Sequence, residues 1–164
     1  MATKHLAAAF AVLLGGVAAA AAAEPESCKT VRFSDVGWTD ITATTGLASR
    51  VLQGLGYTPK ATVLSVPVTY ASLKNKDIDV FLGNWMPTME ADRKPYVDDK
   101  SIEVMGANLE GAKYTLAVLE PTYNAGLKTF ADITKFKDKL KGKIIGIEPG
   151  NDGNRLILDM IKDD

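Results

Sequence analysis

The sequence has 164 residues and a formal net charge of −1, from 19 Lys and Arg against 20 Asp and Glu. This length is typical of one domain, or of one domain and part of a second, and the near-neutral charge argues against nucleic acid as a partner, since such binding requires a concentrated basic face. Apolar residues make up 46% and charged residues 24%, which are ordinary values for globular proteins and exclude a wholly disordered chain.

The N-terminal segment has the features of a secretory signal peptide. Lys4 lies near the start, residues 6–23 carry no charge, and the segment ends in three alanines before Glu24. A short positive region, an apolar stretch and small residues at the cleavage site are typical of such a signal. The alternative, a membrane-spanning helix, is at the lower limit of length and only weakly hydrophobic. We therefore predict that residues 1–23 are removed on export.

Downstream of this segment the sequence alternates between patterns typical of strands and of helices. Predicted strands lie at residues 31–34, 61–66, 78–82, 102–105, 114–119 and 143–147. Predicted helices lie at residues 41–55, 67–76, 86–96, 130–140 and from 151 onward. Thr39 or Asp40 is expected to cap the first helix. Strands separated by helices are typical of βαβ units, so we predict an α/β fold with a largely parallel sheet.

Both tryptophans of the sequence follow predicted strands. Trp38 comes after the strand at 31–34, and Trp85 comes after the strand at 78–82. Ligands of open α/β sheets bind in the crevice outside the carboxyl ends of the strands, so both rings are expected at the rim of a binding site. The alternative is that each ring covers the core and bonds its indole N–H to a loop carbonyl. Two facing rings favour a quaternary ammonium cation, which is attracted to aromatic faces.

The loop at residues 149–154, Pro-Gly-Asn-Asp-Gly-Asn, precedes the last predicted helix. A helix N-terminus can bind an anion, but this loop lacks the lysine and the spacing of a phosphate-binding loop. A turn followed by an Asn or Asp cap accounts for the same residues. The sequence leaves both interpretations open.

The sequence contains one cysteine, Cys28, and one histidine, His5, which lies in the predicted signal peptide. The remaining chain therefore cannot form a Ser-His-Asp triad, a Cys-His dyad or a zinc site of the usual His and Cys ligands. With no paired nucleophile and base, we predict a protein that is not an enzyme and that needs no metal and no cofactor.

Several segments together resemble the periplasmic choline/glycine-betaine binding proteins of ABC importers, most closely the choline-binding members. These segments are Asp-Val-Gly-Trp-Thr-Asp-Ile-Thr-Ala-Thr-Thr at 35–45, Gly-Asn-Trp-Met-Pro at 83–87, Lys-Tyr at 113–114 and Gly-Asn-Asp-Gly at 150–153. The resemblance covers residues 31–164. It implies a two-lobed, type II periplasmic binding protein-like fold, a periplasmic location, a membrane permease as partner and a monomeric state.

The resemblance also implies roles for individual residues. In that family, a box of four aromatic side chains encloses the trimethylammonium group. Trp38, Trp85 and Tyr114 match three of its walls, and Asp40 and Asn151 match the polar partners of the choline hydroxyl.

Members of this family are about twice as long as this chain. We therefore expect a first lobe at residues 24–110 and a partial second lobe at residues 111–164. The fourth aromatic wall, the segment that returns to the first lobe and a disulfide partner for Cys28 are expected to be absent. The chain is thus predicted to be a fragment or the product of a truncated gene.

The leading hypothesis is a receptor for choline, and three alternatives stay open. They are a receptor for glycine betaine or another betaine, an enzyme acting on small cationic metabolites, and a truncated remnant without function. Because the second lobe would lack part of its sheet, we expect Tyr114 and Asn151 not to be held against Trp38. The 164-residue chain alone is then expected not to reach micromolar affinity for choline.

Overall fold

The computed structural model describes residues 25–163. The predicted signal peptide at residues 1–23, with His5, lies outside the described residues. None of the helices within 25–163 combines the length and the apolar character needed to cross a bilayer.

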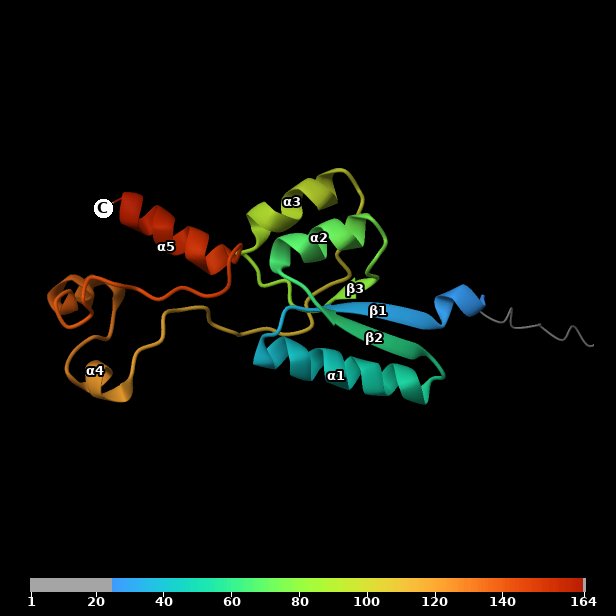
Figure 1. Cartoon of the computed structure of the whole chain (residues 1–164), viewed down its shortest axis with the longest axis horizontal. Coiled ribbons are helices and arrows are strands. Elements are labelled where there is room, and N and C mark those ends of the chain that lie inside the picture. Colours follow the sequence, from blue (N-terminus) through green and yellow to red (C-terminus); the bar gives the residue numbers. More distant parts are fainter. Residues whose placement is uncertain (1–24, 164) are drawn as a thin grey trace, which may run out of the picture.

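The helices and strands are connected in the alternating order of an α/β protein (Figure 1). In chain order they are η1 (Glu26–Cys28), β1 (Thr30–Asp35), α1 (Thr39–Gly54), β2 (Thr58–Val63), α2 (Val66–Lys74), β3 (Val80–Phe81), α3 (Glu90–Asp98), α4 (Glu120–Asn124), η2 (Phe130–Asp132), η3 (Thr134–Phe136) and α5 (Asp152–Lys162), where η denotes a 3-10 helix.

The three strands form one parallel sheet in the order β2-β1-β3. The register pairs Thr30 with Thr58 at one end of β1 and Asp35 with Val63 at the other. Helix α1 lies on one side of the sheet, and α2 and α3 lie on the other (Figure 1). This confirms the predicted α/β class with a parallel sheet. The loops after β1 and β3 leave the same edge of the sheet, and they carry the two tryptophans.

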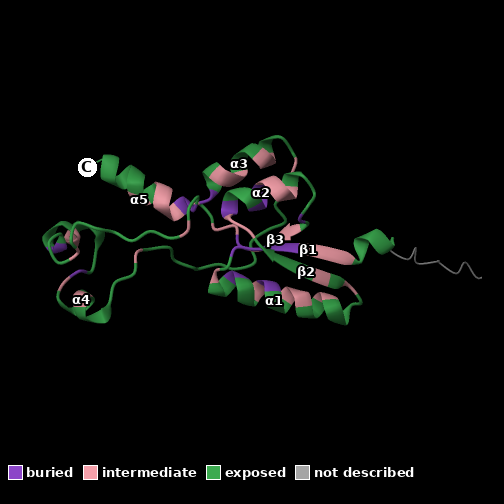
Figure 2. Ribbon diagram, in the orientation of Figure 1, coloured by how far each residue is buried: buried purple, intermediate pink, exposed green. Residues whose placement is uncertain are grey.

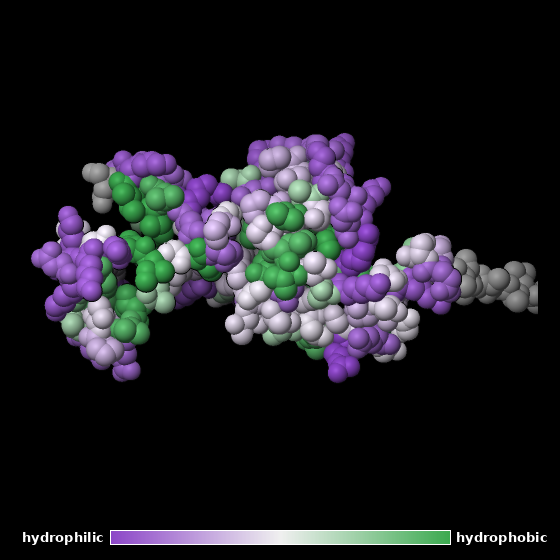
Figure 3. Space-filling model, in the orientation of Figure 1, coloured by the Kyte–Doolittle hydropathy of each residue, from purple (hydrophilic) through white to green (hydrophobic). Residues whose placement is uncertain are grey.

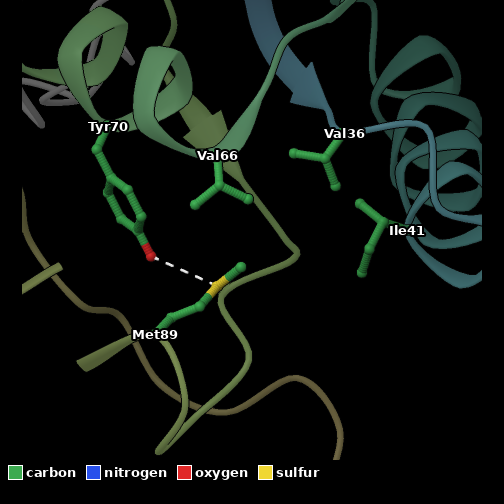
Figure 4. Close-up of a cluster of buried hydrophobic side chains, with 5 residues drawn as sticks. All are labelled: Val36, Ile41, Val66, Tyr70 and Met89. Carbon is green, nitrogen blue, oxygen red and sulfur yellow. Dashed lines mark hydrogen bonds between the residues drawn. The ribbon is translucent and has the colours of Figure 1, made fainter. Parts of the chain in front are cut away.

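The core of this compact part lies beside that edge. Val36, Ile41, Val66, Tyr70 and Met89 form a buried cluster (Figure 4). The Tyr70 hydroxyl lies 2.8 Å from Asn84 Oδ1 and 3.8 Å from the Met89 sulfur, and burial raises the pKa of this hydroxyl. Trp38 and Trp85 pack against the same cluster from outside. Both tryptophan side chains are therefore positioned by packing against the core.

Residues 110–150 form an extended arm that runs away from the sheet and returns to it (Figure 1). Most of the arm is exposed, whereas the buried residues concentrate around β1 and the helices next to it (Figure 2). The arm carries α4, η2 and η3 at its far end. Its returning part leads into α5, which begins beside α3 (Figure 1).

The structure contradicts the predicted strands at 102–105, 114–119 and 143–147, which have no strand partner within residues 25–163. Their apolar residues are the reason for the prediction, and these remain exposed: Ile145 is 93% exposed. An extended segment becomes a strand only when a neighbour satisfies its backbone hydrogen bonds. The pattern thus identified segments suited to a sheet, but the described residues supply no neighbour for them.

The predicted helix at 130–140 is also wrong, since the segment forms η2 and η3 instead. The Thr129 side chain accepts from the Asp132 backbone N–H, and Asp132 Oδ2 accepts from the Thr129 backbone N–H at 3.0 Å; these two bonds form a capping box over a single turn. Lys141, with φ of 54°, ends the segment. Phe136 is buried, but most of its neighbours in the segment are exposed. Helices are stabilised mainly by a packed apolar face, and this segment has little of one.

Three other boundaries differ from the prediction. Trp38, rather than Thr39 or Asp40, is the N-cap residue of α1, and it makes no side-chain capping bond. Asp40 lies in the first turn, where a negative charge favours the helix dipole. Strand β2 begins at Thr58 because it pairs with β1 from Thr30 onward. Helix α3 begins at Glu90, since the chain first closes a turn in which the Met89 N–H bonds to the Trp85 carbonyl.

Candidate functional site

A cavity of about 240 Å³ lies at the sheet edge, where the loops after β1 and β3 meet the arm and the start of α5. All five predicted site residues line it, together with Ile147 and Asp152. The predicted residues come from the α1 start, the loop after β3, the arm and the α5 start: Trp38, Asp40, Trp85, Tyr114 and Asn151.

Three aromatic side chains supply much of the wall. The ring centroids of Trp85 and Tyr114 are 5.9 Å apart, with the ring planes at 41°. Trp38 lines the same cavity from the end of β1. The pKa of the Tyr114 hydroxyl is raised, first by partial burial and then by the charges of Asp152 and Glu148. Tyr114 therefore stays protonated near neutral pH and acts as a hydrogen-bond donor.

One chain of hydrogen bonds joins the compact part of the protein to the arm. Glu148 Oε1 accepts from Trp38 Nε1 at 3.0 Å and from Asn151 Nδ2 at 2.9 Å. Asn151 Oδ1 in turn accepts from the Tyr114 hydroxyl at 3.1 Å and from Gly153 N at 2.8 Å. Tyr114 and Asn151 are thus held against Trp38, which contradicts the expectation that the incomplete second lobe would leave them loose.

Asn151 is the N-cap of α5, which is the turn-and-cap interpretation of the 149–154 loop. An amide oxygen has two lone pairs and an amide nitrogen two hydrogens. The two bonds to Asn151 Oδ1 use both lone pairs, and the bond to Glu148 uses one hydrogen. One N–H of Asn151 therefore stays available to a ligand. The Asp40 carboxylate, which is exposed, makes no hydrogen bond among the described residues and is available as an acceptor.

The start of α5 requires small residues at two positions. A Cβ at Gly153 would overlap the Tyr114 hydroxyl and lie 3.0 Å from Asn151 Oδ1. Gly150 has φ of +84°, a conformation that favours glycine, and a Cβ there would lie 3.0 Å from Pro67 Cγ. These two glycines allow the start of α5 to approach both the aromatic wall and α2.

Arg155 anchors α5 on α3. Its Nη1 and Nη2 each lie 3.0 Å from one oxygen of Asp92, and Nη2 also donates to the Thr88 carbonyl at 3.1 Å. The pairing with Asp92 raises the pKa of Arg155. A bidentate ion pair fixes the orientation of the two side chains as well as the distance between them. The pair therefore determines where the start of α5 meets the cavity.

The sequence analysis assigned no site role to three residues at the cavity: Ile147, Glu148 and Asp152. Asp152 lies within the 149–154 loop, where it was considered only as part of an anion-binding turn or as a helix cap, and Glu148 directly precedes that loop; no pattern distinguished either residue from a surface acid. The side chain of Asp152 is buried, with the residue 1% exposed, and its Oδ2 has no hydrogen-bond partner among the described residues. Within residues 25–163, no three acidic, histidine or cysteine side chains gather as a metal site would require.

The cavity combines aromatic walls with acidic groups. Asp40 and Asp152 line it, Glu148 accepts the Trp38 indole N–H, and none of the described residues that line the cavity is basic. Such a site attracts a cation that has apolar substituents and repels an anion.

Comparison with solved structures identifies the fold. The chain is similar to an ABC-transporter choline binding protein in complex with choline, with a TM-score of 0.80 and 68% identity, over 85% of this chain and 48% of that one. It is also similar to an ABC-transporter choline binding protein in an unliganded semi-closed conformation, with a TM-score of 0.73 and 67% identity, over 84% and 48% of the two chains. The predicted type II periplasmic binding protein fold is confirmed, and the chain spans about half the length of these proteins.

Two curated proteins are also similar to this chain. An uncharacterized protein ORF1 of Chromohalobacter salexigens is 54% identical over 129 residues, which cover 79% of this chain and 83% of that protein. The glycine betaine/carnitine transport binding protein GbuC of Listeria monocytogenes is 28% identical over 108 residues, which cover 65% of this chain and 35% of that protein.

Residues 29–164 match the OpuAC family, described as the substrate binding domain of the ABC-type glycine betaine transport system. The match covers nearly all of the described residues, and the two solved structures and GbuC are described as transport binding proteins. The chain therefore belongs to the OpuAC family of substrate-binding domains of ABC transport systems.

Proposed function

We propose that this protein is a solute-binding receptor of an ABC importer and that its cavity captures choline. The observation that carries the proposal is the arrangement of Trp38, Trp85 and Tyr114 around one cavity with acidic groups, where no lining residue within 25–163 is basic. Support also comes from a similar solved structure that is described as holding choline.

The cavity offers partners to both ends of choline, the trimethylammonium group and the hydroxyl. A trimethylammonium group cannot donate hydrogen bonds, so aromatic faces stabilise it better than polar groups do. The choline hydroxyl can donate to the free Asp40 carboxylate and accept the remaining N–H of Asn151. Binding and delivery need no chemical step, so we propose no enzymatic activity.

Glycine betaine is the second candidate, which the family description favours. Betaine carries a carboxylate in place of the hydroxyl. Asp40 and Asp152 would repel that carboxylate, and in the described part of the chain no residue lining the cavity offers it a positive charge. We therefore propose choline as the preferred ligand.

The remaining features of the proposal concern the cell. We propose that the protein is exported to the periplasm after removal of residues 1–23, acts as a monomer and delivers its ligand to a membrane permease. The division into a first lobe at 24–110 and part of a second at 111–164 belongs to the same proposal.

Titration of the chain with choline, followed by tryptophan fluorescence, tests the ligand. Three rings at about 0.5–2 kcal/mol each, with one or two hydrogen bonds, correspond to about millimolar affinity. Trp38→Ala and Trp85→Ala should each weaken binding by about 30-fold, for a loss of about 2 kcal/mol. Lys135→Ala is the control, since this exposed side chain bonds Asp132 away from the cavity.

Competition between choline and glycine betaine tests the choice of ligand. Choline should bind more tightly, and Asp40→Asn should narrow the difference. No fluorescence change at 50 mM choline, on the scale of the about millimolar affinity expected, or unchanged affinity in Trp85→Ala, would refute the aromatic site. Equal affinities for the two ligands in the unmodified protein would refute the preference.

A further inference from the structure

We propose that Asp152 supplies a fixed negative charge that makes the cavity select a ligand of net positive charge over a neutral ligand of the same shape. The inference rests on the proposed function and adds to it a residue and a physical basis for selectivity.

The Asp152 carboxylate is a buried group with an unpartnered oxygen. Asp152 lines the cavity beside Asn151, it is 1% exposed, and its Oδ2 has no hydrogen-bond partner among the described residues. Buried polar side chains almost always have a partner, and a buried charge without one is costly. A cation in the cavity provides the missing charge.

The groups around Asp152 do not supply the positive charge that would balance it. Burial, and after it the charge of Asp152, raises the pKa of Tyr114, whose neutral hydroxyl offers no balancing charge. Arg155, on the same helix, also interacts electrostatically with Asp152. However, the Arg155 guanidinium is bonded to Asp92 and to the Thr88 carbonyl.

The position of Asp152 in the first turn of α5 explains how the charge is tolerated without a ligand. The helix dipole stabilises an acidic side chain there. This is a competing, purely structural role, and the experiment must separate it from selectivity.

Burial makes Asp152 a stronger source of selectivity than Asp40. Asp40 is exposed, so water and salt screen its charge, whereas the field of a buried carboxylate is screened less. The effect acts through space and depends on the ligand's charge, not on its hydroxyl group. Choline and its carbon analogue 3,3-dimethylbutan-1-ol share one shape and one hydroxyl and differ in that charge.

The test compares these two ligands on the full chain at constant ionic strength. Asp152→Asn should weaken choline binding by at least about tenfold, since one charge pair at an effective dielectric near 20 contributes a tenfold effect even at about 12 Å. Binding of 3,3-dimethylbutan-1-ol should change less than twofold. Asp159→Asn is the matched control: it removes the same charge from the same helix, at an exposed site paired with Lys162. It should leave both affinities unchanged.

A structural role predicts a different result. If Asp152→Asn weakens both ligands equally, or neither, the assignment is overturned. If Asp152→Asn unfolds α5, Asp152→Glu is tested in its place, because glutamate keeps the negative charge. The Glu variant should keep the preference for choline over 3,3-dimethylbutan-1-ol, and a fall in that preference also overturns the assignment. If the unmodified protein binds neither ligand, the proposed function itself fails, and the role of Asp152 fails with it.

Discussion

At the scale of single residues, one carboxylate oxygen organises much of the site. Glu148 Oε1 accepts both the Trp38 indole N–H and an Asn151 N–H. The indole bond fixes the orientation of a ring that is only partly buried against the core. Glu148 is thus a positioning residue, since it acts on the ligand through Trp38 and Asn151.

Replacing Glu148 separates its geometry from its charge. Glu148→Ala removes two hydrogen bonds of about 0.5–1.5 kcal/mol each, so choline binding should weaken about tenfold and the tryptophan emission should shift. Glu148→Gln keeps an oxygen acceptor and should keep the emission of the unmodified protein. An unshifted emission in the Ala variant would show that the indole is held by packing alone.

Replacing Gly153 tests the close approach of α5 to the aromatic wall. Gly153→Ala would push the Tyr114 hydroxyl away, because the added Cβ overlaps it. Choline binding should therefore fall severalfold, although alanine favours a helix over glycine by about 1 kcal/mol. Gly46→Ala in α1 is the control, with nothing within 4 Å of its Cβ. It should raise stability and leave binding unchanged; a normal affinity in Gly153→Ala would contradict the role given to Tyr114.

At the scale of elements, the contact between α5 and α3 decides whether the arm reaches the cavity. Arg155, Asp92 and the Thr88 carbonyl form this contact. The side chain of Asp92 is 16% exposed and that of Arg155 is 37% exposed. Partial burial and two parallel bonds distinguish the pair from ordinary surface ion pairs, which contribute little.

A double-mutant cycle measures this contact. Arg155→Met, Asp92→Asn and the double variant should give a coupling energy of about 1–2 kcal/mol, and Arg155→Met should speed amide exchange in α5. Lys94→Met is the control, since Lys94 and Asp98 form an exposed pair within α3; its effect should stay below about 0.5 kcal/mol. Unchanged exchange in Arg155→Met would show that other contacts hold α5.

At the scale of the whole molecule, a compact part with a core carries an arm with little core of its own. Figure 3 shows hydrophobic surface on the arm as well as on the compact part. The exposed apolar residues of the arm and α5 include Ile144, Ile145, Ile147, Leu158 and Ile161. Stability should therefore come from the compact part.

Two substitutions test whether the compact part, and not the arm, supplies the stability of the protein. Val66 is 1% exposed, so Val66→Ala should lower the free energy of unfolding by about 1–3 kcal/mol. Ile145 is 93% exposed, so Ile145→Ser should change it by less than about 0.5 kcal/mol and should reduce self-association. Chemical unfolding and light scattering measure both effects. A large loss of stability in Ile145→Ser would show that the arm packs on itself.

The sequence by itself determined the α/β class, the parallel sheet and the position of the two tryptophans at one edge of that sheet. Local signals suffice for these, because strand and helix periodicities are read within a few residues and the loops after parallel strands leave one edge. Trp38 and Trp85 follow from that rule, whereas Tyr114 and Asn151 came from resemblance to a family. Only the tertiary structure decided that the segments at 114–119 and 143–147 stay unpaired, since a strand depends on a neighbour. It alone placed Glu148 behind Trp38 and buried Asp152, because an acidic residue carries no local sign of whether distant parts of the chain will remove it from water.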